Sequence, residues 1–459
     1  MEQVTADVCV VGAGFAGLAA ARQLAAAGRQ LAAAGREVVV LEARDRVGGR
    51  VWNRELPDGT VVSAGGTWLG KGQERMFQLC RELGLEVYPQ YDDGDHLLCL
   101  DGRNRRHRGI PKTGPAALAT LGWAFLRLNL MARRLPKDAP WQARRARAWD
   151  ARTLGQWLSH PLNVPSATAH TLLKSTMNLL FCTDPAEVSL LGALVLARGG
   201  GGSGFGYYTD TRKTESHLVD GGAPELARRM AARLGTAVHL SSPVRRIVQN
   251  TTDVEVASDA FAVRARRVIV ATPPVLAGRI LFDPPLPAAH SHLRQRLVPG
   301  AIIRVHTQYA EPFWRGQKLS GQTLAPQSPV PITIDQTPRS GEPGVLSSYA
   351  FGAGAVRLSR LDPKERRDIW LDALAERFGP EARRPTAYLE TDWSEQPWSL
   401  GGMVAHFPPG ALTNYGSALR EPVGRIHWAS TESATLMHGL MEGAVRSGER
   451  AAREVLTAN

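Results

Sequence analysis

Apolar positions form two short unbroken runs near the N-terminus, at residues 8–11 (VCVV) and 38–41 (VVVL). Runs of β-branched residues without polar alternation are typical of strands that are buried on both faces of a parallel sheet. The segment between the runs is rich in alanine, as in a helix. The pattern therefore predicts a strand, a crossover helix and a second parallel strand.

A turn of glycines separates the first run from the helix. Gly12, Gly14 and Gly17 have the GxGxxG spacing of a dinucleotide-binding turn. The first glycine makes the tight bend, the second lets the backbone approach a pyrophosphate, and the third lets helix and strand pack closely. Phe15 and Ala16 open the helix, whose free N–H groups point at the phosphates. We therefore expect these five residues to contact a dinucleotide.

An acidic residue ends the second run, where a carboxylate accepts hydrogen bonds from a ribose. This residue is Glu42, and Ala43 and Arg44 follow it. The chain then reaches a second pair of glycines, of which Gly49 directly precedes Arg50. A glycine pair and an arginine in this place resemble flavoproteins that hold FAD in an extended form, and NAD sites generally lack them. The expected dinucleotide is therefore FAD.

The helix between the two runs contains a repeated heptad. Residues 22–28 and 29–35 both read RQLAAAG, so that Glu42 lies 30 residues after Gly12 instead of about 20. A continuous helix would overshoot the sheet by about 10 Å, and too few residues remain to bring the chain back. We expect the helix to end near Gly28 and the second copy to form a protruding turn. The alternative is a tandem duplication that has no function.

The rest of the chain alternates between helical and extended patterns. Residues 56–59 (LPDG) predict a hairpin turn. Residues 115–158 and 172–196 read as helices inserted between parts of the nucleotide-binding domain. A buried strand at residues 268–274 is broken by two prolines, and the chain closes with a helix at about residues 441–456.

Composition sets limits on function. The chain has 459 residues, of which 43% are hydrophobic and 21% charged, so it can bury the cores of two domains. No apolar stretch reaches 18 residues and the first strand leaves no room for a signal peptide, which predicts a soluble, cytoplasmic protein without a membrane partner. Four cysteines are scattered without metal-ligand spacing: Cys9, Cys80, Cys99 and Cys182. No metal site is expected.

The formal charge of +12 includes clusters of arginine at residues 103–108 and 144–147. A basic surface attracts nucleic acid or anionic membrane. No aromatic residues are interleaved with these clusters and no nucleic-acid module accompanies them. We interpret them as solvated surface and expect no nucleic-acid partner.

Several longer motifs are similar to those of flavin amine oxidases, and most closely to monoamine oxidases. They read VVGAGFAGLAAA, VLEARDRVGGR, GGTWLG, RVIVATPP, EPFWR, GGMVAHFPPG and RIHWASTESAT, and they extend over nearly the whole chain. The resemblance implies an α/β fold of two domains. The FAD domain, which is Rossmann-like, would comprise residues 1–75, 215–290 and 390–459. The substrate domain, a mixed sheet covered by helices, would comprise residues 76–214 and 291–389.

The resemblance also implies the reaction. Members of this family oxidise an amine to an imine by hydride loss to flavin N5, and dioxygen reoxidises the flavin and yields hydrogen peroxide. The partners would be a small amine and dioxygen, and family members are commonly homodimers. Further FAD contacts carried over by the resemblance or expected from glycine-dense loops are Gly65, Gly66, Thr67, Trp68, Val244, Trp393, Met403, Glu432, Gly439, Leu440 and Met441. The positive end of the last helix dipole would stabilise the reduced flavin, and a core role for Trp393 is equally open.

The sequence departs from the family at positions that matter for the chemistry. Met403 replaces the cysteine that tethers the flavin, so FAD should bind without a covalent bond. Val404 and Leu440 replace the two aromatic residues that sandwich the amine, which removes a cation–π contribution. The family's lysine near flavin N5 is Arg304, an arginine that retains a donor but cannot easily act as a base.

The expected substrate pocket is apolar and wide. The resemblance places Leu179, Leu180, Leu196, Ile332 and Tyr349 in it, beside Val404 and Leu440. His438 would face the substrate or form a structural hydrogen bond. Arg304 would act in catalysis as a positive neighbour of the flavin. The alternative is that it anchors a substrate carboxylate.

Three functions remain open at this point. The first is an FAD-dependent amine oxidase with an altered range of substrates. The second is a dehydrogenase or oxidase of an amino acid or of an amine-bearing biosynthetic intermediate. The third is a flavin-binding protein that has lost turnover, because both sandwich aromatics and the lysine are replaced.

Overall fold

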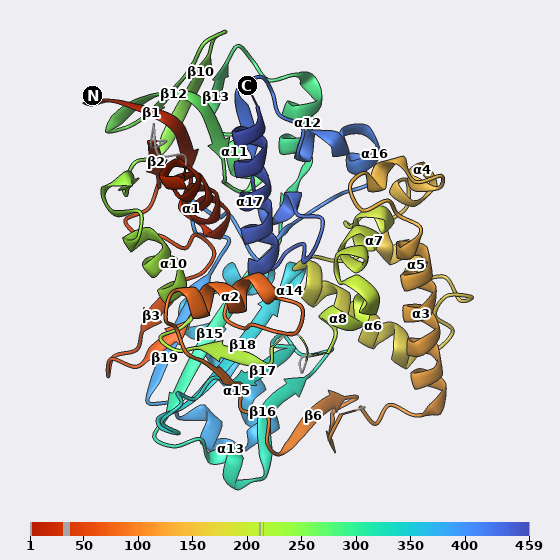
Figure 1. Ribbon diagram of the computed structural model, residues 1–459. Helices are drawn as coiled ribbons and strands as arrows, with labels where there is room; N and C mark the ends of the chain where they lie inside the picture. The colour runs from red at the N-terminus through yellow and green to blue at the C-terminus, as the bar shows by residue number, and fades with distance from the viewer. Residues whose placement is uncertain (1, 31–36, 110, 211–212, 214, 459) are drawn as a thin grey trace.

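Two β-sheets and a layer of helices make up the computed structural model (Figure 1), which describes residues 2–30, 37–109, 111–210, 213 and 215–458. Both chain termini lie beside the first sheet, at the top of Figure 1, and the second sheet lies below it. The helices of the middle of the sequence form a separate group on the right.

The first sheet has eight strands in the order β13-β10-β11-β12-β1-β2-β9, with β21 paired to β12. The strands are β1 (Glu2–Val11), β2 (Val38–Leu41), β9 (Val238–His239), β10 (Val244–Gln249), β11 (Val254–Ser258), β12 (Phe261–Val270), β13 (Leu281–Asp283) and β21 (Ile426–Trp428). β1 pairs in parallel with both β2 and β12. The predicted strand, crossover helix and parallel strand are therefore present.

Four helices pack around this sheet: α1 (Phe15–Gln30), α2 (Glu74–Glu82), α10 (Ala223–Ala232) and α17 (Met441–Thr457). α17 lies close against α1 because Gly448 has no side chain: a Cβ atom there would lie 2.0 Å from the carbonyl oxygen of Ala16. The described part of α1 runs to Gln30, two residues beyond the predicted end at Gly28. The rest of the second heptad, with its predicted protruding turn, lies outside the described residues.

The second sheet has seven strands in the order β19-β15-β18-β17-β16-β6-β7. The strands are β6 (Asp95–Leu100), β7 (Arg103–His107), β15 (Ile302–Tyr309), β16 (Leu319–Leu324), β17 (Ile332–Asp335), β18 (Gly344–Phe351) and β19 (Ala387–Asp392). All residues of β15 and β18 are buried, as expected of central strands, and the two strands pair antiparallel with Arg304 opposite Tyr349. α15 (Pro363–Phe378) covers one face and contributes Trp370 and Phe378 to its core.

The helical group consists of α3 (Pro115–Arg133), α4 (Ala146–Asp150), α5 (Leu154–Leu158), α6 (Ala167–Phe181), α7 (Leu190–Gly199) and α8 (Phe205–Tyr208). They share a large apolar core. The buried carboxylate of Asp150 joins this group to the later chain, because it accepts hydrogen bonds from the Ser189 hydroxyl at 2.5 Å and from the backbone N–H of Thr413 at 2.7 Å.

The remaining elements are short and connect these three groups. The strands form three pairs: β3 (Asn53–Glu55) with β4 (Val61–Ser63), β5 (Val87–Pro89) with β8 (His217–Val219), and β14 (Val298–Pro299) with β20 (Ala405–His406). The short helices are α11 (Pro274–Ala277), α12 (Ala288–Arg296), α13 (Phe313–Gly316), α14 (Gly352–Ser359) and α16 (Ala411–Tyr415). The β3–β4 hairpin encloses the predicted LPDG turn.

We propose a division into two domains close to the expected one, with two adjustments. α2 belongs with the first sheet, because the Glu442 carboxylate of α17 accepts the N–H of Met76 at 2.9 Å and Met76 lies in the same core. Its position moves the boundary expected at residue 76 to after this helix. β19 pairs with β15 along its length, which moves the boundary expected at residue 390 to after Asp392.

Candidate active site

The glycine turn between β1 and α1 has the geometry that a bound pyrophosphate requires. Gly12 has a φ of +101°, which favours glycine. A Cβ atom on Gly17 would lie 1.9 Å from the carbonyl oxygen of Gly12, so only glycine lets the helix start this close to the strand. A Cβ atom on Gly14, in contrast, would have no heavy atom within 4 Å. The space over Gly14 fits a phosphate that approaches the backbone at the N-terminus of α1.

Glu42 lies beside this turn and is buried. Its Oε2 atom accepts the N–H of Ala13 at 2.6 Å, and its Oε1 atom accepts the N–H of Arg44 at 3.0 Å. These two bonds orient the carboxylate, which has about four acceptor sites and so retains capacity for a ribose hydroxyl. The backbone of Glu42 also accepts the N–H of Ser242 at 2.7 Å, which brings the start of β10, with Val244, next to the predicted ribose position.

Arg50 joins three parts of the chain that are distant in sequence. Its guanidinium binds both carboxylate oxygens of Glu432, at 2.7 and 3.2 Å, and donates to the Met403 carbonyl at 2.9 Å. Burial raises the pKa of Glu432, but the charge and hydrogen bonds of Arg50 outweigh that effect and hold it below its ordinary value. The second glycine loop, the Met403 loop and the end of the chain are thereby fixed to one another.

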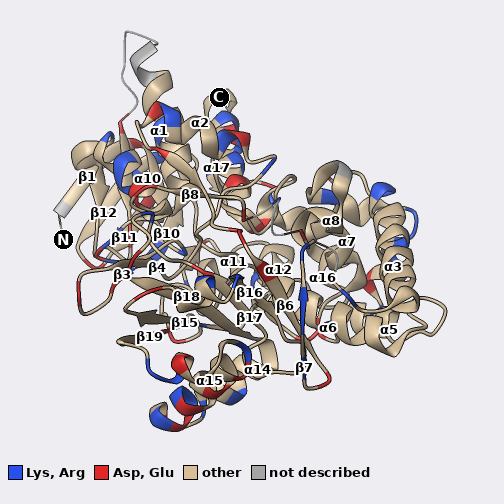
Figure 2. Ribbon diagram, turned by 90° about the horizontal axis from the view of Figure 1, so that it is seen from below, with Lys and Arg blue, Asp and Glu red and all other residues tan. Residues whose placement is uncertain are grey.

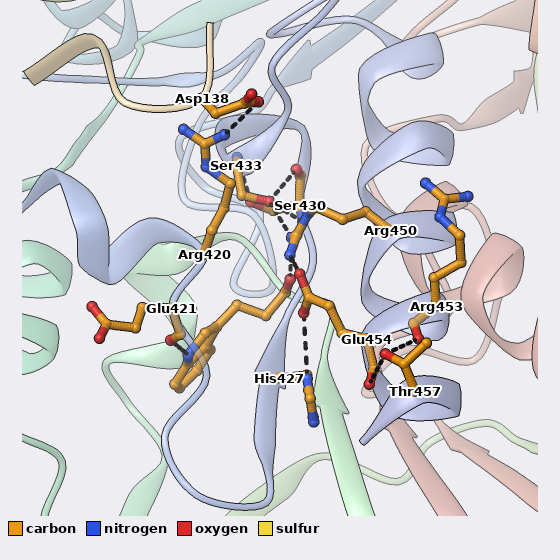
Figure 3. A network of polar contacts seen from close by, with 11 residues as sticks. Asp138, Arg420, Glu421, His427, Ser430, Ser433, Arg450, Arg453, Glu454 and Thr457 are labelled. Carbon is orange, nitrogen blue, oxygen red and sulfur yellow. Dashed lines mark hydrogen bonds and ion pairs between the residues drawn. The ribbon is translucent and has the colours of Figure 1, made fainter. Parts of the chain in front are cut away.

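A polar network lies next to η6 (Thr431–Ser433), the short helical turn that carries Glu432 (Figure 3). Arg450 of α17 donates to the Trp428 carbonyl at 2.6 Å and forms an ion pair with Glu454. The other oxygen of Glu454 lies 3.3 Å from Nδ1 of His427 on β21. The last helix is thus tied to the end of the last strand of the first sheet.

The glycine-dense loop at residues 63–70 packs tightly against the other cofactor segments. A Cβ atom on Gly65 would lie 2.3 Å from the Arg50 carbonyl oxygen, and one on Gly66 would lie 3.3 Å from the sulfur of Met441. The indole of Trp393 donates to the Ala64 carbonyl at 2.8 Å and is buried. The structure therefore brings the expected flavin-contacting residues from four segments together.

The start of α17 faces the Met403–Val404 loop. Leu440 is the residue before the helix, and Gly439 has a φ of +83°. A Cβ atom on Gly439 would lie 3.5 Å from Cγ1 of Val404, so the residue that precedes Leu440 lies beside Val404. Met403 itself is 40% exposed, and its thioether has no group able to form a covalent bond to a flavin.

His438 is buried beside this loop, with its ring 5.8 Å from that of Phe407. Burial lowers the pKa of His438 to about 4, so the imidazole is neutral at physiological pH. Its Nδ1 atom has no hydrogen-bond partner in the described part of the chain. The open choice between a substrate contact and a structural hydrogen bond therefore stays a prediction.

Arg304 is almost completely buried, with 2% of its surface exposed. Its Nε donates to Ser347 at 2.8 Å, and its Nη1 donates to the Gly65 carbonyl at 2.6 Å and to Thr67 at 2.9 Å. Its guanidinium carbon lies 5.0 Å from the ring centre of Tyr349 and 5.4 Å from that of Trp68. The side chain thus links the second sheet to the glycine-dense loop.

Three polar atoms around Arg304 are buried and have no hydrogen-bond partner among the described residues: Nη2 of Arg304, the hydroxyl of Tyr349 and Oε2 of Glu215. Burial raises the pKa of Glu215 to about 7, although the charge of Arg304 partly opposes this. Burial also raises the pKa of Tyr349 to about 12. Sequence reasoning missed Glu215, since an isolated glutamate in a polar segment gives no signal.

The expected pocket residues divide between two apolar clusters. Leu179, Ile332 and Tyr349 lie in one cluster with Trp393, close to Arg304. Leu180 and Leu196 are buried in the core of the helical group, and Leu440 packs at its margin. Apolar residues of the second sheet and of the helical group together agree with an apolar pocket. The contacts of the individual residues with a substrate remain predictions.

Comparison with known proteins gives the family. The sequence profile described as "Flavin containing amine oxidoreductase" matches residues 15–456. The chain belongs to this family. It is therefore an FAD-dependent oxidoreductase that acts on the CH–NH bond of amines, as its motifs predict. The resemblance on which the sequence analysis relied is confirmed.

Individual relatives cover nearly the whole chain. A Mycobacterium tuberculosis (strain ATCC 25618 / H37Rv) protein named as flavin-containing monoamine oxidase AofH is 40% identical over 98% of this chain and 96% of its own length. L-amino acid dehydrogenase of Synechocystis sp. is 33% identical over 98% of this chain and 94% of its own. This amine oxidoreductase is thus similar to proteins named for different amino compounds.

Solved structures confirm the two-domain α/β fold. Putrescine oxidase bound to putrescine has a TM-score of 0.93 and 32% identity, covering 99% of this chain and 100% of its own. Cyclohexylamine oxidase from Brevibacterium oxydans IH-35A has a TM-score of 0.90 and 32% identity, with 98% of both chains covered.

Proposed function

We propose that this amine oxidoreductase oxidises a small, largely apolar amine to an imine and that dioxygen is the electron acceptor. FAD, when bound, supplies the hydride acceptor at N5 and the reaction with dioxygen that yields hydrogen peroxide. The observation that carries the proposal is the cradle formed by the space over Gly14, the oriented carboxylate of Glu42 and the Arg50–Glu432 pair. These residues would hold the pyrophosphate, the ribose and the loops that flank the ring.

The residues around the ring position would orient the substrate without an aromatic sandwich. Val404 is buried next to Gly439 and presents only methyl groups, as does Leu440. We infer that apolar contact, and not a cation–π interaction, positions the amine there. Arg304 would act as a fixed positive neighbour of the flavin, because burial lowers its pKa but three hydrogen bonds still favour the charged form.

A flavin assay tests this function directly. The purified yellow protein is mixed without oxygen with primary, secondary and cyclic amines, and the flavin absorbance is followed. Bleaching by an amine, followed by hydrogen peroxide on admission of air, is the expected result. Acid precipitation should release all of the flavin, since Met403 cannot form a thioether bond to it; flavin that stays on the precipitate would contradict this. No bleaching across the panel would favour a protein without turnover.

One observation favours a second candidate, the dehydrogenation of an amino acid or of a related amine-bearing intermediate. Nη2 of Arg304 is an unused donor beside Tyr349, and a substrate carboxylate would accept from it. L-amino acid dehydrogenase is among the relatives, which supports testing this class. Bleaching by L-amino acids in preference to the corresponding decarboxylated amines, with slow reoxidation in air, would identify this reaction.

We further propose a homodimer in the cytoplasm that has no nucleic-acid partner, as the family resemblance and the absence of a nucleic-acid motif suggest. Analytical ultracentrifugation of the FAD-loaded protein tests the dimer. A single species of one chain's mass, 49.7 kDa, at micromolar concentration would exclude it.

A further inference from the structure

One face of α3 is apolar and exposed. Large side chains there are Leu118 (38% exposed), Trp123 (49%), Leu126 (52%) and Leu130 (47%). They recur at helical spacing, so they lie on the face opposite to the one that packs into the helical core. A surface helix ordinarily carries polar residues on its outer face. This outward-facing stripe therefore needs an explanation beyond the fold.

Leu162, in the connection between α5 and α6, extends the stripe. It is 75% exposed, and its carbonyl accepts hydrogen bonds from Trp123 at 3.3 Å and from Arg127 at 3.2 Å. Leu162 and the four exposed residues of the stripe are called here the α3 patch: Leu118, Trp123, Leu126, Leu130 and Leu162. They are five of the eleven large apolar side chains that are exposed in the described residues. Figure 1 shows α3 at the outer edge of the helical group, with no element beyond it.

The segments that carry the α3 patch have basic side chains and no acidic ones. Residues 111–137 contain five lysines and arginines and no aspartate or glutamate, and residues 151–183 also lack acidic side chains. Basic residues lie before the stripe, at exposed Lys112, and directly after it, at exposed Arg133 and Arg134. Figure 2 accordingly shows no acidic residue on α3, α5 or α6.

We propose that the α3 patch binds reversibly to the surface of an anionic lipid bilayer. A helix that presents Trp and Leu between basic ends lies in the plane of such a surface, with its apolar side chains at the boundary of headgroups and acyl chains and its basic residues on the headgroups. No helix within the described residues is long and apolar enough to cross a membrane, so the contact is interfacial.

A second copy of the chain fits this face less well. Two-fold pairing places the same patch on both partners. If the two α3 helices ran antiparallel, Lys112 of one would face the Arg133 end of the other, and like charges oppose such an interface. The proposal revises the expectation of no membrane partner, because composition does not reveal which apolar residues the fold leaves exposed.

Co-sedimentation with lipid vesicles tests the proposal. The FAD-loaded protein is mixed in 100 mM salt with vesicles of phosphatidylcholine alone or with phosphatidylglycerol as a third of the lipid. We expect binding to the anionic vesicles to be at least tenfold stronger than to the neutral ones, and to weaken as salt rises. Equal binding to both, or no binding to the anionic vesicles, would overturn the proposal.

Matched variants locate the contact. The double substitution Trp123→Ser and Leu126→Ser should reduce binding to anionic vesicles at least tenfold. Leu281→Ser removes a side chain that is even more exposed (63%) from the edge strand β13 and should change binding less than twofold. Flavin absorbance and the melting temperature verify that each variant is folded. Equal losses in both variants, or a wild-type dimer that only the double variant dissociates, would contradict the assignment.

Discussion

The carboxylates of the predicted cofactor cradle and the polar groups around Arg304 differ in how they are paired. In the cradle, the carboxylates of Glu42 and Glu432 each accept two or more hydrogen bonds from the protein itself. Around Arg304, three buried polar atoms have no partner within the described residues. A buried polar group without a partner costs roughly 1–3 kcal/mol.

We interpret this difference as one between a region prepared for a single fixed ligand and a region whose polar atoms remain available to a substrate. The carboxylates of the cradle are oriented by hydrogen bonds from the protein itself, which suits a cofactor that stays bound through many turnovers. The polar atoms on the substrate side retain hydrogen-bonding capacity that a substrate or ordered water would use. The following experiments measure each side of that contrast, from the largest expected effect to the smallest.

The glycine turn gives the largest expected effect. Gly17→Ala places a methyl group 1.9 Å from the Gly12 carbonyl oxygen and should lower the free energy of unfolding by more than about 4 kcal/mol. Gly14→Ala, the matched control, meets no protein atom, so the apoprotein should remain stable while FAD affinity falls at least tenfold. Urea unfolding and FAD titration measure the two effects. Unchanged FAD affinity in Gly14→Ala would show that the pyrophosphate lies elsewhere.

Arg50→Met should lower the free energy of unfolding by about 3–5 kcal/mol at pH 8, because it leaves the buried Glu432 carboxylate without its counter-charge. In the wild type the pKa of Glu432 is lowered, so its contribution to stability is present above its unfolded pKa and is lost on acidification. In Arg50→Met the Glu432 carboxylate should protonate readily, so the loss of stability relative to the wild type should be smaller at pH 5 than at pH 8. Unfolding measured at both pH values tests this.

The double variant Arg50→Met with Glu432→Gln is the control for that experiment. It removes both charges, so it should recover much of the stability at pH 8 and abolish the difference between pH 5 and pH 8. A double variant as unstable as Arg50→Met would mean that packing, and not the unpaired charge, is responsible.

Glu215→Gln should stabilise the protein at alkaline pH. The fold raises the pKa of Glu215 to about 7, so the folded state favours the protonated form and stability falls as pH rises from the unfolded value near 4.5 through 7. The substitution should raise the free energy of unfolding by up to about 3 kcal/mol at pH 8 and by little at pH 4.5. Thermal unfolding across this range measures it. A gain independent of pH would mean that folding does not shift the pKa of Glu215.

Aromatic residues at the sandwich positions give the smallest effect. Val404→Tyr with Leu440→Tyr should raise kcat/KM for a primary amine by about fivefold, which corresponds to a cation–π contribution of about 1 kcal/mol. An amine analogue without the charged nitrogen tests whether any change in binding depends on charge. Unchanged turnover would show that the lost aromatics do not limit the reaction.

Sequence reasoning could predict the cradle because its signals are local. The spacing of Gly12, Gly14 and Gly17 fixes a turn, and Glu42 ends the next strand at a fixed distance in space despite the inserted heptad. The resemblance also singled out Arg304, but the partners of its side chain lie on Ser347 and in the glycine-dense loop more than two hundred residues earlier. Such partners have no local signature.

The sequence by itself determined the family, the cofactor and the substitutions Met403, Val404 and Arg304, because motifs and residue types are properties of the chain. Only the tertiary structure decided which groups are satisfied and which surfaces are covered. Glu215 became a feature of the candidate site because folding brings it near Arg304, and α3 became an exposed apolar face because no segment among the described residues covers its outer side. Burial and pairing are set by contacts between distant segments, which no local pattern encodes.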